Sequence, residues 1–262
     1  MWQYNLEEIV ATCRAAEAKN SPAMVLLFPW ALQQFGGILA NMAADACRSA
    51  KVPISLHLDH CQDVDLVKYA ASLPFDSIMV DMSHYEKAEN LRLTKELTIY
   101  CHERGIATEA EPGRIEGGED GVKDTAELEG IMTTPEEALL FLETGIDFLA
   151  PAFGNVHGEY GSKGPRAWLQ FHRLKSIQEA VKGKSALVLH GSGGFTQSIY
   201  QDCIKAGVSK INVNIQLIEP WREMMVARKS FVPLTKLIED SIDIFQKQVS
   251  DLMDMVGSTG KA

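Results

Sequence analysis

The sequence predicts an α/β protein built around a parallel sheet. Short apolar segments that read as strands alternate with helical patterns through most of the chain, and the connections between them are short. The apolar segments lack the alternation of apolar and polar residues, as is typical of strands buried on both faces. Several of them run directly into acidic or imidazole side chains. Together these patterns indicate repeated βα units whose strand ends carry a site.

Seven strands are predicted, and their number leaves the closure of the sheet open. They are Ala23–Leu27, Ile54–Leu58, Ser77–Asp81, Ile106–Glu111, Phe148–Ala152, Ala186–Leu189 and Lys210–Val213. An eight-stranded (β/α)8 barrel needs one more, and only Met1–Tyr4 precedes the first predicted helix, so the first strand would be short or missing. An open doubly wound sheet is the alternative, disfavoured because no Gly-x-Gly-x-x-Gly follows the first strand.

Helix signals fill the intervals between these strands. Asn5 is a plausible N-cap for the first helix, with acidic residues in the turn that follows it. Gly105 ends a helix predicted over Asn90–Arg104, and Pro135 follows Thr134 at the start of another. The last fifty residues read as helix.

Composition limits the class of protein. The chain has 262 residues, 46% of them hydrophobic, which suits a single barrel domain spanning residues 1–262. A formal charge of -10 argues against nucleic acid or an anionic membrane as the main partner. The five cysteines are scattered and form no Cys-x-x-Cys pair, which favours a reducing, cytoplasmic location. No signal sequence or apolar stretch of membrane-spanning length is evident.

Three histidines follow predicted strands: His60, His157 and His190. The carboxyl ends of parallel strands meet at one rim, so these imidazoles would converge there. Three nitrogen ligands with an open position are the arrangement of a catalytic zinc site, and Glu111 could add a fourth or exchanging ligand. The alternative is that each is a separate, hydrogen-bonded core histidine; the recurrence at equivalent positions favours the metal.

Two acidic residues are candidates for proton transfer. Asp59, next to His60, could move a proton beside a metal-bound oxygen. Glu119 lies in a Gly-rich loop that could carry a base over a substrate, although local sequence alone favours a solvated acid. The Gly191–Gly194 turn before a helix could present N–H groups to an anion, a weak signal by itself.

Taken together, these segments resemble the class II, zinc-dependent fructose-bisphosphate and tagatose-bisphosphate aldolases. The resemblance runs in order from about Asn5 to the C-terminal Gly-Ser-Thr-Gly-Lys and rests on five motifs. They are Leu56-His57-Leu58-Asp59-His60, Glu109-Ala110-Glu111-Pro112-Gly113 with Gly117–Gly121, Phe153-Gly154-Asn155-Val156-His157-Gly158, Leu189-His190-Gly191 and Lys210-Ile211-Asn212-Val213.

The resemblance implies a TIM barrel in a homodimer or homotetramer, active in carbohydrate metabolism such as glycolysis. It implies Zn²⁺ on His60, His157 and His190 with Glu111 near the metal, and it leaves open another divalent metal or an added monovalent cation. The implied reaction is reversible aldol cleavage of a ketose (bis)phosphate, such as fructose 1,6-bisphosphate, to dihydroxyacetone phosphate and an aldehyde through a zinc-stabilised enediolate.

The resemblance also implies individual roles. Asp59 would handle the proton of the hydroxyl whose carbon–carbon bond breaks, and Glu119 would exchange a proton with the enediolate. Asn212 would contact the dihydroxyacetone part of the substrate. The remaining expected substrate-binding residues belong to the strand-end loops; they are Gly158, Gly191, Ser192, Gly193, Asn214 and Lys163.

The chain departs from the family pattern where phosphate is held. Gly161 stands where the family usually has lysine, with Lys163 two residues later, and the hydroxyl of the glycine turn moves to Ser192. The usual threonine of the last strand is replaced by Ile215, and a family serine after the strand Ala23–Leu27 corresponds to Pro29. The metal and proton-transfer groups are kept while the phosphate donors differ.

Three functions therefore remain in view. The first is a metal-dependent aldolase acting on a ketose phosphate. The second is an aldolase-like enzyme for a non-phosphorylated or differently substituted ketose, and the third is a diverged, non-catalytic metal-binding paralogue. Asp59 and Glu119 count against the third, because a scaffold needs neither. A metal-dependent sugar epimerase ranks below these, since it would need a different acid/base pairing.

Overall fold

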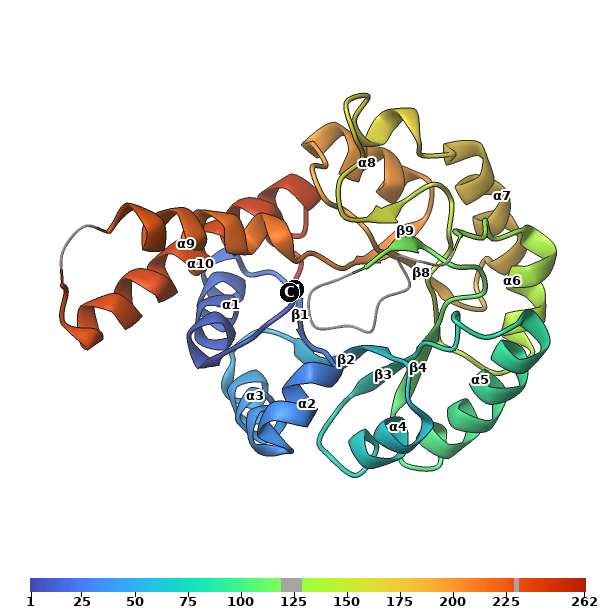
Figure 1. Cartoon of the computed structure of the whole chain (residues 1–262), viewed down its shortest axis with the longest axis horizontal. Coiled ribbons are helices and arrows are strands. Elements are labelled where there is room, and N and C mark those ends of the chain that lie inside the picture. Colours follow the sequence, from blue (N-terminus) through green and yellow to red (C-terminus); the bar gives the residue numbers. More distant parts are fainter. Residues whose placement is uncertain (119–128, 229–230) are drawn as a thin grey trace.

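The computed structural model describes residues 1–118, 129–228 and 231–262, and it arranges them as a curled parallel sheet surrounded by helices (Figure 1). Seven strands pair in the order β1-β2-β3-β4-β6-β8-β9. Their bounds are Ala23–Leu27 (β1), Ile54–Cys61 (β2), Ser77–Val80 (β3), Ala107–Ala110 (β4), Phe148–Leu149 (β6), Ala186–Leu189 (β8) and Val208–Ile211 (β9). All these pairs are parallel, as the alternating sequence pattern predicts.

A short stretch at the start of the chain closes the sheet into a barrel. Trp2 forms a parallel bridge with Leu26 of β1, and its backbone N–H donates to the carbonyl of Val213, just beyond β9, at 3.2 Å. On the β1 side, Gln3 N donates to Leu26 O, and Leu26 N donates to Met1 O, both at 2.9 Å. The first strand is therefore present as a stub, and the predicted TIM barrel is confirmed.

The described part of the chain has ten α-helices, and most of them pack around the outside of this barrel. They are Leu6–Lys19 (α1), Pro29–Phe35 (α2), Ile38–Ser49 (α3), Val64–Ala70 (α4), Lys87–His102 (α5), Pro135–Leu142 (α6), Phe171–Val181 (α7), Gln197–Lys205 (α8), Ile215–Ala227 (α9) and Leu234–Val256 (α10). The helices bury aliphatic faces against the outer faces of the strands, where most of the core lies. No described helix is long and apolar enough to cross a membrane.

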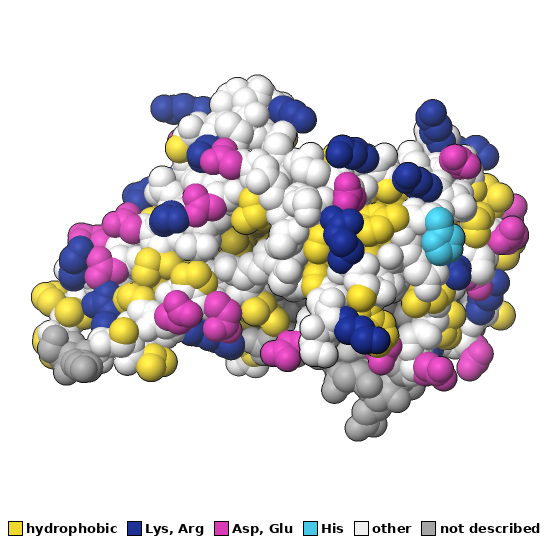
Figure 2. Space-filling view, turned by 90° about the horizontal axis from the view of Figure 1, so that it is seen from above, with side chains coloured by type: hydrophobic (Ala, Val, Ile, Leu, Met, Phe, Trp, Pro, Cys, Tyr) yellow, Lys and Arg dark blue, Asp and Glu magenta, His cyan; other side chains and the backbone are white. Residues whose placement is uncertain are grey.

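The C-terminal part is mainly helical, as predicted, and is divided into two helices. It folds as α9 and α10: α9 and the start of α10 form a two-helix arm that extends from the barrel, while the C-terminal part of α10 packs against α1 and buries Val249, Leu252 and Met253 (Figure 1). The far end of the arm carries exposed apolar side chains: Val226 is 87% exposed, Phe231 95% and Leu234 69%. Hydrophobic side chains are visible at that end of the molecule in Figure 2, among charges of both signs.

The interior of the barrel is partly ionic. Lys210 of β9 reaches Glu109 of β4 with its Nζ 2.6 Å from Oε2, and it lies 3.5 Å from His57 Nε2 of β2. These strands are not neighbours in the sheet, so the contacts span the barrel interior. Met79, Ala150 and Val188 make a small separate apolar cluster. The charges thus lie within the ring of strands and approach its carboxyl ends.

Candidate active site

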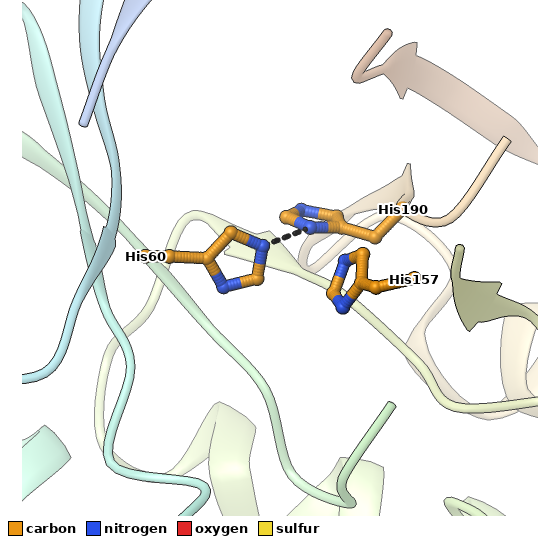
Figure 3. Close-up of side chains that lie close together, drawn as sticks. All are labelled: His60, His157 and His190. Atoms are coloured by element: carbon orange, nitrogen blue, oxygen red, sulfur yellow. Dashed lines mark hydrogen bonds between the residues drawn. The ribbon is translucent and has the colours of Figure 1, made fainter. Parts of the chain in front are cut away.

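Three histidines from separate strand ends meet at the carboxyl rim of the barrel (Figure 3). His60 belongs to β2, His157 to the short strand β7 (Val156–His157), and His190 follows β8 directly. One ring nitrogen of each lies within 4.8 Å of the others, and all three residues are at most 8% exposed. The convergence predicted from strand-end positions is present in the structure.

A backbone irregularity presents both Asp59 and His60 to this rim. The register between β2 and β3 shifts between Leu58 and Cys61, and His60 has a left-handed φ of 45°. In a regular strand the two side chains would point to opposite faces. The bulge turns them to the same end, and Asp81, just beyond β3, fixes the imidazole with a 2.8 Å contact from Oδ2 to His60 Nδ1.

The other two histidines are tied together by the loops that carry them. Asn155 donates from Nδ2 to the carbonyl of His190 at 3.1 Å, and the Tyr160 hydroxyl donates to the carbonyl of Gly191 at 2.5 Å. Gly191 has φ 63°, and a Cβ there would lie 2.4 Å from the carbonyl oxygen of Val156. Only glycine permits this close approach, which brings the chain after β8 against β7.

The histidines experience opposite electrostatic environments. Burial lowers the pKa of His60, but the negative charges of Asp59 and Asp81 outweigh it and raise the pKa to about 10. For His157, burial and the charges of the other two imidazoles hold the pKa well below its usual range. The site therefore concentrates negative charge around His60 while keeping His157 neutral, the form that ligates a metal.

Asp59 is held by two N–H donors on one oxygen. Trp2 Nε1 donates to Oδ2 at 2.6 Å and Asn212 Nδ2 donates to the same atom at 2.7 Å. Oδ1 has no hydrogen-bond partner among the described residues, with His57 Nε2 at 3.6 Å. Burial opposes ionisation of Asp59, yet the neighbouring His60 and His190 hold its pKa well below the usual range. An ionised carboxylate with one open oxygen can accept a proton.

Glu111 follows β4 and lies beside His60 and Asp81, with one ligand atom of each within 4.8 Å of the others. Its Oε1 accepts the backbone N–H of Ile115 at 2.5 Å, while its buried Oε2 has no partner in the described part of the chain. Burial and the nearby Asp81 raise its pKa well above the usual value. An unpaired buried carboxylate oxygen is costly unless a proton or a cation occupies it.

This donor set fits a divalent metal. It offers three imidazole nitrogens, an adjacent carboxylate and unpaired buried oxygens, which is the chemistry that zinc and related ions bind. A carboxylate contacts the second ring nitrogen of two of the histidines. Asp81 Oδ2 lies 2.8 Å from His60 Nδ1, and Glu109 Oε1 lies 2.8 Å from His190 Nε2. Asp81 and Glu109 thereby orient the imidazoles of His60 and His190, as carboxylates usually do around metal-binding histidines.

The expected substrate-binding residues divide into two groups. A cavity beside the histidines is lined by most of them; they are Gly158, Gly191, Ser192, Gly193, Asn212 and Asn214. Lys163 is exposed and is not among the lining residues, and Glu119 lies outside the described residues. Ser192 uses its hydroxyl to donate to the carbonyl of Asn212 at 2.9 Å, so it braces the loop. The described lining includes neither lysine nor arginine.

Sequence reasoning assigned no role to four residues that the structure brings to the site. Asp81 and Glu109 support histidines, Lys210 pairs with Glu109, and Trp2 contacts Asp59. The acidic end of the predicted strand Ser77–Asp81 was a usable signal for Asp81. Nothing in the local sequence marked Trp2, because its position depends on closure of the barrel.

Comparison with known proteins identifies the family of the chain. The family model described as fructose-bisphosphate aldolase class-II matches residues 1–261. The chain belongs to the class II fructose-bisphosphate aldolase family.

Individual relatives of this class II aldolase agree over nearly its whole length. The fructose-bisphosphate aldolase of Streptococcus pneumoniae serotype 4 is 36% identical over 277 residues, covering 98% of this chain and 91% of that protein. A Coccidioides immitis crystal structure superposes with a TM-score of 0.96 at 56% identity, covering 99% of this chain and 91% of that one. The YdjI aldolase of Escherichia coli K12 gives 0.83 at 26% identity, covering 100% and 91%.

Family membership makes this chain a metal-dependent aldolase, which is a lyase. The histidine cluster supplies a metal site consistent with that class. The predicted family and enzyme class are therefore confirmed.

Proposed function

We propose that this chain catalyses reversible cleavage of a ketose bisphosphate, such as fructose 1,6-bisphosphate, to dihydroxyacetone phosphate and an aldehyde. The convergence of His60, His157 and His190 beside a buried, ionised Asp59 carries the proposal. The fructose-bisphosphate aldolase name of the S. pneumoniae relative supports the substrate class.

Zinc is the proposed metal, with His60, His157 and His190 as ligands and Glu111 as an additional or exchanging one. When bound, such an ion acts as a Lewis acid for the carbonyl and neighbouring hydroxyl of the ketose. Asp81 and Glu109 would keep the ligand nitrogens of His60 and His190 pointed inward, because each contacts the opposite ring nitrogen. Another divalent metal, or an added monovalent cation, is compatible with these residues.

Asp59 is the proposed base for cleavage. Its Oδ1 would take the proton of the substrate hydroxyl while the adjacent carbon–carbon bond breaks. The hydroxyl carbon becomes the aldehyde carbonyl, and the bonding electron pair stays on the dihydroxyacetone half. Glu119, which lies outside the described residues, would then supply the proton that this half needs.

Asn212 is the proposed contact for the dihydroxyacetone half. Its Nδ2 is engaged by Asp59, whereas its buried Oδ1 has no partner in the described part of the chain and can accept from a substrate hydroxyl. Phosphate would meet backbone N–H groups of Gly191 and Gly193 and the start of α9 at Asn214. Ser192 would contribute through its backbone, since its hydroxyl is engaged.

The test is cleavage of fructose 1,6-bisphosphate and tagatose 1,6-bisphosphate with coupled detection of triose phosphate. We expect cleavage that a chelator abolishes and added Zn²⁺ restores. Asp59→Ala should lose at least about a thousandfold in kcat while keeping its metal content. Asp65→Ala, an exposed substitution on α4, is the control and should behave as the parent. Activity that survives complete metal removal would rule the proposal out.

One observation favours a second candidate, an aldolase for a ketose with fewer phosphates. The described lining of the cavity has neither lysine nor arginine and includes Ile215, and Lys163 is exposed and does not line it. Comparing kcat/KM for fructose 1,6-bisphosphate, fructose 1-phosphate and fructose distinguishes the two. Equal values for the three sugars would select the second candidate.

We also propose that the enzyme is a cytoplasmic homodimer or homotetramer. All five cysteines are free, as suits a reducing compartment. The apolar far end of the two-helix arm would be covered by a second copy, because a Phe231 exposed at 95% is unfavourable in water. Light scattering should give a multiple of the 28.9 kDa chain mass.

A further inference from the structure

Trp2 contributes both to the closure of the barrel and to the active site. The closure, called the seam below, is where Met1–Gln3 join β1 to the end of β9. Its backbone completes the sheet between β1 and β9, while its side chain, in a residue 4% exposed, lines the cavity together with Asp59 and His60. A residue that only closed a barrel would need nothing polar on its side chain. Here the indole N–H is directed at a carboxylate.

The indole shares one carboxylate oxygen with Asn212. Trp2 Nε1 and Asn212 Nδ2 lie 2.6 and 2.7 Å from Asp59 Oδ2, and they come from the two sides of the seam. Two donors on Oδ2 fix the plane of the carboxylate and leave Oδ1 without a hydrogen bond in the described part of the chain. The orientation of the open oxygen thus depends on both donors.

Aromatic packing holds the indole in place. Trp2 stacks on Phe28 with ring centroids 4.9 Å apart and an interplanar angle of 18°, and it approaches the His60 ring edge-on with the centroids 6.2 Å apart. Phe28 in turn stacks on Trp30 at 5.6 Å. Such a stack restricts the ring to one orientation, so the N–H is preorganised toward Asp59.

We propose that Trp2 is a positioning residue for cleavage: its indole N–H aims the open oxygen of Asp59 at the substrate hydroxyl. The inference rests on the proposed function, in which Asp59 takes the hydroxyl proton as the carbon–carbon bond breaks. Glu119 handles the later carbon-bound proton, so Trp2 affects the first step and not the second.

Because Asp59 and Glu119 act in different steps, the rates of cleavage and of proton exchange should respond differently to the loss of Trp2. A purely structural role would change both rates together. An aldolase both cleaves its ketose and exchanges a C–H proton of dihydroxyacetone phosphate with solvent. Cleavage uses Asp59, whereas exchange uses the metal and Glu119. Loss of Trp2 as a donor should slow cleavage alone, while loss of folding or metal should slow both.

The experiment compares the parent, Trp2→Phe and Trp221→Phe. Trp221 also donates its indole N–H, to Ser241 Oγ at 3.0 Å, but it bridges α9 and α10 and does not line the cavity, so it controls for the chemistry of the substitution. Cleavage of fructose 1,6-bisphosphate is measured by coupled assay, and proton exchange by NMR in deuterated water. Metal content is measured for each protein.

We expect Trp2→Phe to lower kcat for cleavage by about tenfold or more, because it removes a hydrogen bond to a charged group. Its KM, metal content and exchange rate should stay within about twofold of the parent. Trp221→Phe should match the parent in every measurement. Unchanged cleavage in Trp2→Phe, or a parallel loss of cleavage and exchange with full metal content, would overturn the inference.

A second replacement keeps the test decisive if Trp2→Phe folds poorly. Incorporating 3-benzothienylalanine at position 2 preserves the shape of the ring and removes only the N–H. Its cleavage rate should fall as in Trp2→Phe, and parent-like cleavage would again reject the role. A parent with bound metal that neither cleaves nor exchanges would instead contradict the proposed function, and with it the role of Trp2.

Discussion

At the scale of single residues, the site depends on one unusual backbone conformation. His60 adopts φ 45°, which costs a non-glycine residue on the order of 1 kcal/mol or more. The surrounding structure maintains it through the bulge in β2 and the hydrogen bond that His60 Nδ1 donates to Asp81. Because of this conformation, the side chains of Asp59 and His60, which are neighbours in sequence, face the same rim of the barrel.

The hydrogen bond from His60 to Asp81 leads to a prediction about metal affinity. Asp81→Asn keeps the shape of the side chain but removes the charge that orients His60 and favours its ligation. We expect the affinity for Zn²⁺ to fall by about 10- to 100-fold, measured by competition with a chromophoric chelator. Asp45→Asn, on the exposed face of α3, is the control and should bind as the parent. An Asp81→Asn affinity equal to the parent would show that the contact is dispensable.

At the scale of elements, the ends of strands and helices are defined by local hydrogen bonds. Thr134 caps α6 with a full capping box: its Oγ1 accepts from Glu137 N at 3.2 Å, and Glu137 Oε2 accepts from Thr134 N at 3.0 Å. Thr196 precedes α8 at the same position but makes no side-chain cap. Two threonines at equivalent positions therefore differ in whether they form a capping box.

This difference predicts unequal effects of the same substitution. Thr134→Ala should lower the free energy of unfolding by about 1 kcal/mol and the melting temperature by about 2–4 °C. Thr196→Ala should change either quantity by less than half as much, since no capping bond is lost. Both are measured by thermal and urea unfolding of the metal-loaded protein. Equal destabilisation by the two would mean that the capping box contributes nothing.

At the scale of the whole molecule, a buried network of charges crosses the barrel. Burial raises the pKa of Glu109, but Lys210 and His190 outweigh it and lower the pKa to about 2. Asp59 and Asp81 also have lowered pKa values, because positive imidazoles outweigh the effect of their burial. Ionised carboxylates therefore stabilise the fold at neutral pH.

The lowered pKa values predict acid sensitivity. A carboxyl with a depressed pKa contributes stability that is present above its unfolded value, near 4.5 for glutamate, and is lost as the pH falls toward 2. We expect the melting temperature of the metal-free protein to fall steeply between pH 5 and about 2. Glu109→Gln should reduce this slope while lowering stability at pH 7, since Lys210 loses its partner. Glu103→Gln, which is exposed, should leave the slope unchanged, and a flat parent profile would refute the prediction.

Most of the fold could be predicted from the sequence because each strand and helix has a strong local signal. Apolar runs bounded by glycine and proline located all seven strands, although the bounds moved by one to three residues at several ends. The three histidines were found because strand-end positions recur along the chain. These are properties of short segments and need no knowledge of contacts.

What the sequence could not predict depends on contacts between distant segments. Trp2 contacts Asp59 across 57 residues of sequence, and Lys210 contacts Glu109 across 101 residues. The sequence around one residue of such a pair contains no signal for the other. The bulge at His60 was also missed, because regular alternation is the default for a strand. Lys163 was selected by proximity in sequence, but its loop keeps it exposed and away from the cavity lining.

The stub at Trp2 has a dynamic consequence. Elsewhere in the barrel neighbouring strands share a ladder, whereas this seam depends on a few bonds around Met1, Trp2 and Gln3. Local openings begin where such support is thinnest, so amide exchange at Trp2, Gln3 and Leu26 should outpace that of central strands such as β3. Each opening would also withdraw the indole from Asp59. A local opening of residues 1–3 would then stop turnover while the rest of the barrel stays folded, so unfolding measurements would not detect it.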